Sequence, residues 1–189
     1  MNMYAYVGND PVNLTDPSGL CAQKSTNCVE QVSRTTNADN SVTVSRTDTV
    51  TNGSNSTTSP SGEIRLLPQS SANGAPATVT SGMEDNLLDL SDTVSSTINV
   101  HSGVRSQAQQ NSLKGNNANT VASTSQHTIG DAADISANNI SGVDLSKAAV
   151  DSGNFQRVNL YPSGSVHIDQ KNVGKGTQFY NNWKRKPNP

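Results

Sequence analysis

The C-terminal half of this 189-residue chain predicts an α+β domain, with a small antiparallel sheet and flanking helices. Apolar residues recur at helical spacing after residue 81, and short alternating apolar runs follow between residues 98 and 169. The whole chain is only 31% hydrophobic and 4% aromatic, and residues 41–61 are mostly Ser, Thr or Asn. We therefore expect the hydrophobic core to come mainly from residues 81–189.

The segment before this domain predicts a hairpin and a linker. Val42, Val44 and Val50 share one face at a period of two within residues 29–52, and residues 37–40 offer a turn. Residues 52–61 predict a flexible connector, because Ser, Thr, Asn and Gly dominate them. Residues 21–80 are thus expected to form a hairpin and linker between an N-terminal segment and the domain.

A first helix is predicted over residues 82–95. Ser81 and Glu84 have the spacing of a capping box, in which a side chain at each position bonds the backbone of the other. The residues that follow at helical spacing form one apolar stripe: Met83, Leu87, Leu90 and Val94.

Two more helices are predicted by their boundary residues. Ser106 can cap a second helix, which Gly115 ends. Asp144 opens a third helix, which closes near Gly153.

Three strands complete the expected domain. Residues 98–101 predict a short strand, and residues 155–160 and 165–169 predict two more. Residues 161–164, Tyr-Pro-Ser-Gly, offer a turn between the last two, which are therefore expected to form an antiparallel hairpin.

Histidine and carboxylate residues in this half have the composition of a metal site. All three histidines of the chain lie here, and Asp134 follows His127 by seven residues, with His167 in a predicted strand. A catalytic zinc site uses three protein ligands and keeps the fourth position open for water. Two His and one Asp meet that number.

Three sequence blocks resemble a known family. Residues 125–134 resemble the S-x-H-x-x-G-x-A-x-D signature of D-Ala-D-Ala carboxypeptidase-type zinc peptidases. Residues 100–106 resemble the S-G-x-R-S strand end of that family, and residues 161–169 resemble its closing Y-P-S-G…V-H-x-D strand. The resemblance implies the fold shared with lysostaphin-type peptidases and the hedgehog domain, a zinc cleft, and cell-wall peptide as substrate.

The resemblance also implies roles for individual residues. His127, Asp134 and His167 would be the Zn²⁺ ligands of a D,D-carboxypeptidase or D,D-endopeptidase. Arg105 would bind the terminal carboxylate of the substrate or the oxyanion of the tetrahedral intermediate. Ser125 would donate a hydrogen bond near the metal or to the substrate.

The residue that handles the proton is displaced from its usual place. Many relatives carry Glu or Asp three residues before the last ligand, where this chain has Gly164. Asp169 lies two residues after His167 and on the same strand face, so it could accept a proton from the attacking water or orient the imidazole. Asp131 and His101 are the other candidates.

The N-terminus resembles a different family. Residues 4–20 look like the end of an Rhs repeat core, whose toxin-bearing C-terminus is released by self-cleavage directly after the motif P-x-x-x-x-D-P-x-G-L. The resemblance implies a cut between Leu20 and Cys21. The motif residues are Pro11, Asp16, Pro17, Gly19 and Leu20.

Together the two resemblances imply an antibacterial Rhs effector of the type VI secretion kind. Its domains would be the end of the Rhs core (1–20), the hairpin and linker (21–80) and the zinc peptidase (81–189). Once released from the Rhs core shell, it would act on peptidoglycan stem peptides in the periplasm of target bacteria. A cognate immunity protein would protect the producer by plugging the zinc cleft.

Two other functions remain open. A metal-dependent nuclease toxin would need basic residues near its site, but residues 116–146 contain no Lys or Arg and the net charge is -2. Nucleic acid is therefore not an expected partner. A catalytically silent cell-wall-binding module on the same fold would explain Gly164.

The sequence also bears on membrane and redox context. No run reaches the roughly 18 apolar residues of a membrane span, and residues 1–19 do not have the pattern of a secretory signal. Cys21 and Cys28 would form a disulfide in an oxidising compartment and stay reduced in the cytosol.

Overall fold

A computed structural model gives the fold and describes residues 27–69, 72–116, 125–172, 174, 176–182 and 184–187. In chain order the strands are β1 (Cys28–Thr36), β2 (Val42–Asn52), β3 (Asn55–Leu66), β4 (Ile98–Ser102), β5 (Ala132–Ala137), β6 (Arg157–Leu160), β7 (Val166–Asp169), β8 (Gln178–Asn181) and β9 (Lys184–Lys186). The helices are α1 (Ser81–Val94), α2 (Gln107–Asn116), the short 3-10 helix η3 (Gln126–Thr128) and α3 (Gly142–Asp151).

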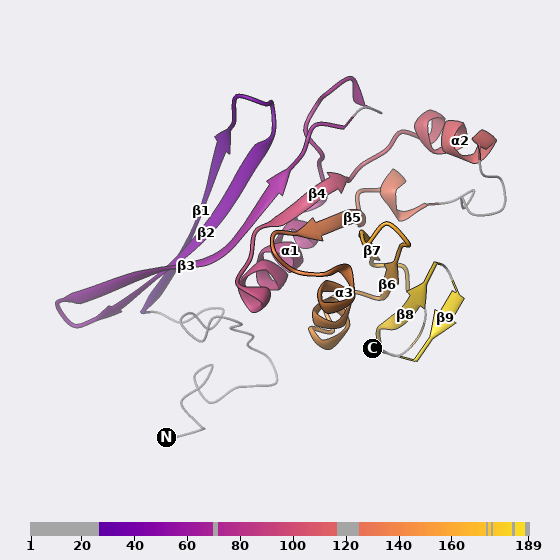
Figure 1. Ribbon diagram of the computed structural model, residues 1–189. Coiled ribbons are helices and arrows are strands. Elements are labelled where there is room, and N and C mark those ends of the chain that lie inside the picture. Colours follow the sequence, from indigo (N-terminus) through magenta and orange to yellow (C-terminus); the bar gives the residue numbers. More distant parts are fainter. Residues whose placement is uncertain are drawn as a thin grey trace.

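All these strands form one sheet, in the order β1-β2-β3-β4-β5-β7-β6-β8-β9 (Figure 1). The mixture of helices and strands agrees with the prediction. The expected small sheet is wrong, because nine strands take part. The neighbours pair antiparallel except for β3 with β4 and β6 with β8, which are parallel.

The three N-terminal strands, β1 to β3, form a long antiparallel ribbon that continues directly into the rest of the sheet. We call these three strands the ribbon. The predicted hairpin is confirmed as β1 and β2. The predicted connector over residues 52–61 is wrong, because most of it lies in β3, which pairs with β2. Threonine is β-branched and suits a strand, and Thr49 and Thr58 share a hydrogen bond of 2.8 Å across this pair. Ile64 then pairs with Ile98 and joins the ribbon to β4.

The three predicted helices are present, with corrected N-caps for two of them. Thr80, and not Ser81, caps α1, since its backbone is extended and its hydroxyl accepts a hydrogen bond from the Met83 amide. Ser141 caps α3, and Asp144 lies in the first turn. The predicted cap of α2 is confirmed, because the Ser106 hydroxyl accepts a hydrogen bond from the Gln109 amide at 3.2 Å.

The corrected cap of α1 can be tested by stability. Thr80→Ala should lower the free energy of unfolding by about 1 kcal/mol, because the Met83 amide loses its acceptor. Ser81→Ala should change it far less, since Ser81 is already inside the helix. Urea unfolding of the two variants compares them directly, and a larger loss for Ser81→Ala would restore the original assignment.

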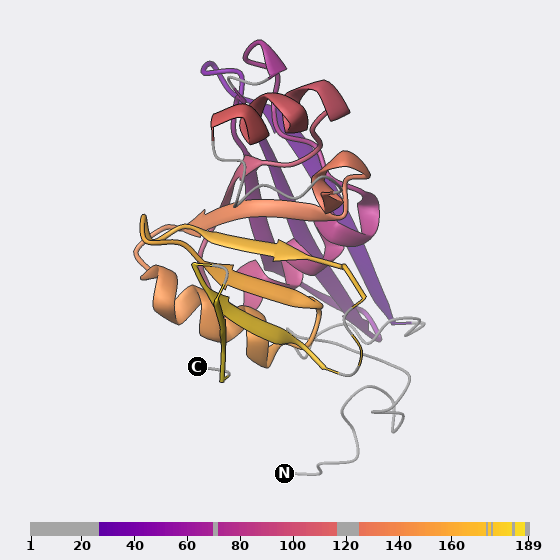
Figure 2. The same cartoon turned by 90° about the vertical axis from the view of Figure 1, so that its right-hand side faces the viewer.

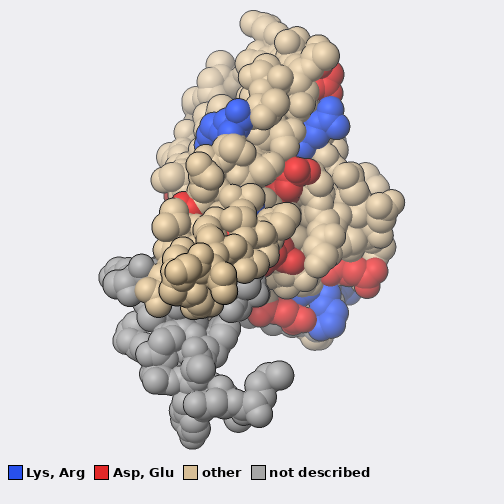
Figure 3. Space-filling model, turned by 90° about the vertical axis from the view of Figure 1, so that its left-hand side faces the viewer, with Lys and Arg blue, Asp and Glu red and all other residues tan. Residues whose placement is uncertain are grey.

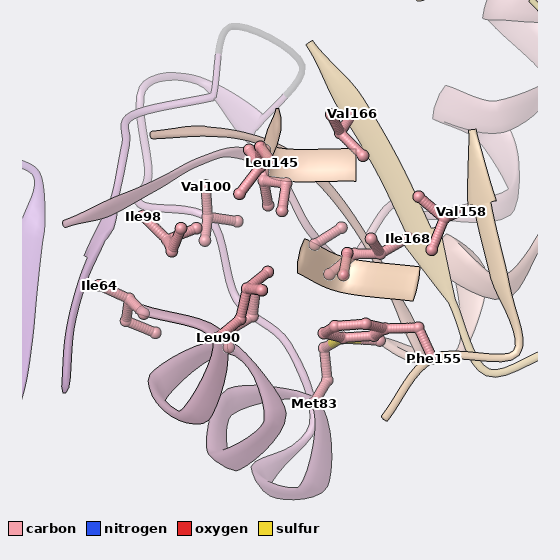
Figure 4. Close-up of a cluster of buried hydrophobic side chains, with 14 of the residues drawn as sticks. Ile64, Met83, Leu90, Ile98, Val100, Leu145, Phe155, Val158, Val166 and Ile168 are labelled. Carbon is pink, nitrogen blue, oxygen red and sulfur yellow. The ribbon is translucent and has the colours of Figure 1, made fainter. Parts of the chain in front are cut away.

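One hydrophobic core lies between the sheet and the helices α1 and α3. Figure 4 shows Leu90 and Met83 of α1 facing strand residues such as Ile98, with Phe155 closing the cluster beside Met83. Most of these residues follow residue 81, as predicted. Three from the ribbon also belong to the core, namely Val44, Ile64 and Leu66.

Strand alternation leaves polar residues on the opposite face of the sheet. In β5, Ala133 and Ile135 enter the core, so Asp134 points to the other face. In β7, Val166 and Ile168 enter the core, so His167 also points to the other face. We call this the outer face. Figure 2 shows β5, β7, β6 and β8 side by side, with α3 behind these strands.

Several N-terminal predictions lie outside the described residues. The self-cleavage motif, residues 11–20, and Cys21 belong there. Cys28, at the start of β1, is disulfide-bonded. Within the described residues, no helix is long and apolar enough to cross a membrane.

Candidate metal centre

His127, Asp134 and His167 come together on the outer face. Asp134 of β5 and His167 of β7 are direct cross-strand partners, and η3 brings His127 to the same place. Among the described residues, these three form the group of His, Cys, Asp or Glu side chains whose ligand atoms lie close enough together to hold one metal ion. The three predicted ligands are therefore adjacent in the fold.

The distances within this cluster suit zinc. Tetrahedral bonds of about 2.0–2.1 Å to nitrogen and oxygen put ligand atoms about 3.3 Å apart. His127 Nε2 lies 3.3 Å from His167 Nδ1 and 3.5 Å from Asp134 Oδ2, and His167 Nδ1 lies 2.9 Å from Asp134 Oδ1. Small side-chain shifts would bring all three ligands to one zinc ion.

The backbone around His127 determines which ring nitrogen faces the cluster. Nδ1 lies 2.7 Å from the carbonyl oxygen of Gly103, which can only accept, so Nδ1 carries the proton. Nε2 is then the ring nitrogen that faces the cluster, and its lone pair is the one that a metal ion could take. The Ser125 hydroxyl accepts a hydrogen bond from the His127 amide at 3.3 Å and begins η3. Ser125 thus positions His127 through its backbone.

A buried carboxylate orients His167 from behind. Asp169 Oδ2 lies 2.9 Å from His167 Nε2, the ring nitrogen that faces away from the cluster. Arg157 donates to both oxygens of Asp169, and the Lys171 amide donates to Oδ1. Asp169 is fully buried among these donors. Of the two roles that the sequence left open, this geometry supports orientation of His167 over proton transfer.

The charges of the cluster shift three pKa values. Burial raises the pKa of Asp134, but hydrogen bonds from His127 and His167 outweigh it and hold the pKa well below its usual range. Burial lowers the pKa of His167, but Asp134 and Asp169 raise it by more, so the pKa lies above its ordinary value. Burial likewise raises the pKa of Asp169, and hydrogen bonds from His167 and Arg157 bring it below the ordinary value. Both carboxylates are therefore ionised at neutral pH and attract a cation.

The orienting role of Asp169 predicts a specific defect. Asp169→Asn keeps the shape of the side chain but removes the negative charge behind His167, so zinc affinity should fall about 10–100-fold. Competition with a chelator of known affinity measures this. If Asp169 is instead the general base, zinc affinity should remain and only kcat should fall.

Arg105 lies at the edge of the cluster. Its Nη2 is 2.5 Å from Asp134 Oδ2, and its Nε donates to the Ser102 hydroxyl at 2.9 Å. Its backbone amide donates to the His127 carbonyl oxygen. The guanidinium therefore stands beside the proposed metal position, where it can meet a negative charge that develops on the substrate.

The other candidate bases are placed differently. Asp131 accepts a hydrogen bond from the Thr80 hydroxyl at 2.9 Å and lines a pocket with residues of α1, away from the cluster. His101 is exposed on the outer face, with Nε2 2.8 Å from the Ser136 hydroxyl. Gly164 has φ +86 in the turn between β6 and β7, a backbone conformation that favours glycine.

Two residues that hold the site were missed from the sequence. Gly103 supplies the carbonyl for His127, and an added Cβ there would overlap the carbonyl oxygen of Thr78. Only its place in the S-G-x-R block hinted at a role. Arg157 pairs with Asp169 across the β6–β7 hairpin. The turn at residues 161–164 already implies this register, so Arg157 could have been found.

Two His, one Asp and a nearby Arg on one sheet face have the composition of a metallopeptidase site. Residues 71–175 match the family model described as "Peptidoglycan L,D-endopeptidase MepK". The match covers more than half of the chain, and the chain belongs to this family of zinc-dependent peptidases that act on peptidoglycan. All three cluster residues, Arg105 and Asp169 lie inside the matched segment. No curated protein and no solved structure matches the chain.

Proposed function

We propose that this chain is a zinc peptidase that hydrolyses peptide bonds in peptidoglycan stems, with His127, Asp134 and His167 as the metal ligands. The observation that carries the proposal is the tetrahedral spacing of these three side chains in a chain of a peptidoglycan peptidase family. A bound zinc ion would supply Lewis-acid polarisation of the scissile carbonyl and activation of water.

The side chains divide the remaining work. Asp169 and Arg157 hold the His167 ring with Nδ1 toward the cluster, and Gly103 holds the His127 ring with Nε2 toward it. Arg105 stabilises the negative charge that develops on the carbonyl oxygen, a contribution that can be worth several kcal/mol. Its contact with Asp134 keeps the guanidinium at the reacting bond before substrate binds.

Two peptide bonds are candidates for cleavage. The signature of residues 125–134 favours a D,D bond, as in D-Ala-D-Ala carboxypeptidases or D,D-endopeptidases, whereas the description of the matched family favours an L,D cross-link. Purified muropeptide dimers with each type of cross-link, digested by the zinc-loaded chain, separate these specificities. Released D-Ala indicates a carboxypeptidase, and no product from any muropeptide would overturn the proposal.

We further propose that the peptidase is the toxic end of an Rhs effector that acts in the periplasm of target bacteria and is neutralised by an immunity protein. The motif at residues 11–20 supports this. Residues 21–189, produced in the periplasm of a bacterial host, should cause lysis, and the same chain kept in the cytoplasm should not. Equal toxicity in both compartments would contradict periplasmic action.

The nuclease alternative has little support from charge. On the side of the molecule shown in Figure 3, Lys and Arg lie in small separate groups beside Asp and Glu, without a broad basic area. Residues 116–146 contain no Lys or Arg. Polyanion binding depends on such groups. Degradation of plasmid DNA by the zinc-loaded chain would favour the nuclease.

The silent binding module is the second alternative, favoured by Gly164. It shares the zinc site but lacks turnover. The muropeptide digestion decides it, because a module would bind the peptides and leave them intact.

A further inference from the structure

The outer face extends from the metal centre across the ribbon as a polar surface. The strand residues Val44, Ile64, Ile98 and Ile135 enter the core. The residue beside each of them therefore points to the outer face. Each of these neighbours pairs with the next across adjacent strands, so they form one row over four strands: Thr43, Arg65, Asn99 and Ser136.

This row begins close to the metal centre. Ser136 follows Asp134 by two residues on β5 and shares its face, about 7 Å along the strand at ~3.3 Å per residue. Arg65 lies two strands from Ser136 in this row, about 10 Å across the sheet at ~4.8 Å per strand. Polar side chains link β5 to β4 along this path. His101 Nε2 lies 2.8 Å from the Ser136 hydroxyl, and Asn99 donates to Asn138 Oδ1 at 2.9 Å.

The path ends in a pocket of about 460 Å³ on the ribbon side. Its lining includes Asn138, Arg65, Glu63 and Asp39. Arg65 pairs with Asp39 at 2.5 Å, and both side chains are substantially exposed, at 40% and 52%. Glu63 Oε1 accepts a hydrogen bond from the Thr97 hydroxyl at 2.7 Å. One pocket thus offers a guanidinium and a carboxylate to an incoming ligand.

We propose that this pocket binds the zwitterionic end of a cell-wall peptide, where an ammonium and a carboxylate sit on one carbon. Arg65 takes the carboxylate and Glu63 the ammonium, while the scissile bond lies at the metal centre. The inference rests on the proposed function. About 7 Å along β5 and about 10 Å across the sheet put the backbone of Arg65 about 12 Å from that of Asp134, the length of about four extended residues, so one stem peptide can reach both places. Arg65 and Glu63 lie outside the matched segment 71–175, so this subsite would be a feature of the ribbon.

Binding to the full-length, metal-free chain tests the pocket without relying on catalysis. The probes are a purified stem peptide that ends in a free diamino acid and the same peptide acetylated on that amine. Isothermal titration should show about tenfold weaker binding of the free peptide to Arg65→Gln and to Glu63→Gln, the loss of one charge-assisted hydrogen bond. The acetylated peptide should bind wild type and Glu63→Gln equally.

A matched control and an opposite variant complete the design. Arg34→Gln removes an exposed arginine that pairs with the largely buried Glu84 of α1 on the core side, and it should bind like wild type. Asp39→Asn releases Arg65 from its own partner and should strengthen binding. Equal affinities of wild type and Arg65→Gln, no preference for the free amine, or no binding by wild type would overturn the pocket. Hydrolysis is measured separately, with the zinc-loaded chain. If the chain hydrolyses muropeptides and Arg65→Gln binds the peptide like wild type, only the pocket is refuted and the proposed function stands.

Discussion

His127→Ala should abolish stoichiometric zinc binding and lower peptidoglycan hydrolysis by about a thousandfold or more. A bound zinc ion would supply several kcal/mol of transition-state stabilisation, and each 1.36 kcal/mol corresponds to about a tenfold change in rate. His127 offers one of the three ligand atoms and lies in the buried part of the cluster. Its loss leaves Asp134 and His167 as a two-ligand site. Release of soluble muropeptides from purified sacculi, resolved by chromatography, measures the effect.

His101→Ala is the matched control for that experiment. His101 is the remaining histidine of the chain, and it lies on the same outer face but does not belong to the three-residue cluster. The variant should bind one zinc ion like wild type. A loss of zinc in His101→Ala, or full zinc occupancy in His127→Ala, would contradict the assignment of the ligands.

Gly103→Ala should destabilise the fold and the metal centre together. An added Cβ would overlap the Thr78 carbonyl oxygen and lie 2.8 Å from the Thr78 carbonyl carbon. Backbone atoms cannot rotate away, so the strand end must move, at a cost of about 3 kcal/mol in the free energy of unfolding. The Gly103 carbonyl that holds His127 Nδ1 would move with it. Urea unfolding and zinc titration should therefore both report a loss.

Gly82→Ala controls for the loss of a glycine. Gly82 lies in α1, and an added Cβ there meets nothing within 4 Å. This variant should be as stable as wild type or more stable by up to about 1 kcal/mol, because alanine favours a helix. If Gly103→Ala matched it in unfolding midpoint and zinc affinity, the close contact of Gly103 with Thr78 would have no structural role.

The predictions that succeeded rest on local patterns. The block at residues 125–134 contains two members of the three-residue cluster only seven residues apart, and the strands around Tyr161-Pro162-Ser163-Gly164 form the expected hairpin. The predicted helix boundaries also lie near the observed ones, because capping residues act within one helical turn. The shift from Ser81 to Thr80 shows the limit, since adjacent hydroxyl residues offer the same chemistry and only the backbone angles distinguish them.

The predictions that failed depend on contacts distant in sequence. Residues 52–61 are predicted as a connector because Ser and Thr suit loops as well as strands, and only pairing with β2 places most of them in a strand. β5 was missed because Ile135 is its one large apolar residue. The same limit applies to Asp169. Its spacing from His167 showed that the two residues share a face, but only the fold shows Arg157 holding the carboxylate behind the ring.

The zinc content and zinc K-edge absorption spectrum of the purified full-length chain test the metal centre most directly. We expect one zinc ion per chain, with two imidazole ligands and otherwise oxygen at about 2.0–2.1 Å, and no sulfur ligand. We expect no zinc in His127→Ala. A wild-type chain that binds no divalent metal, or one whose zinc has sulfur neighbours, would contradict the assignment of His127, Asp134 and His167 as a catalytic zinc centre.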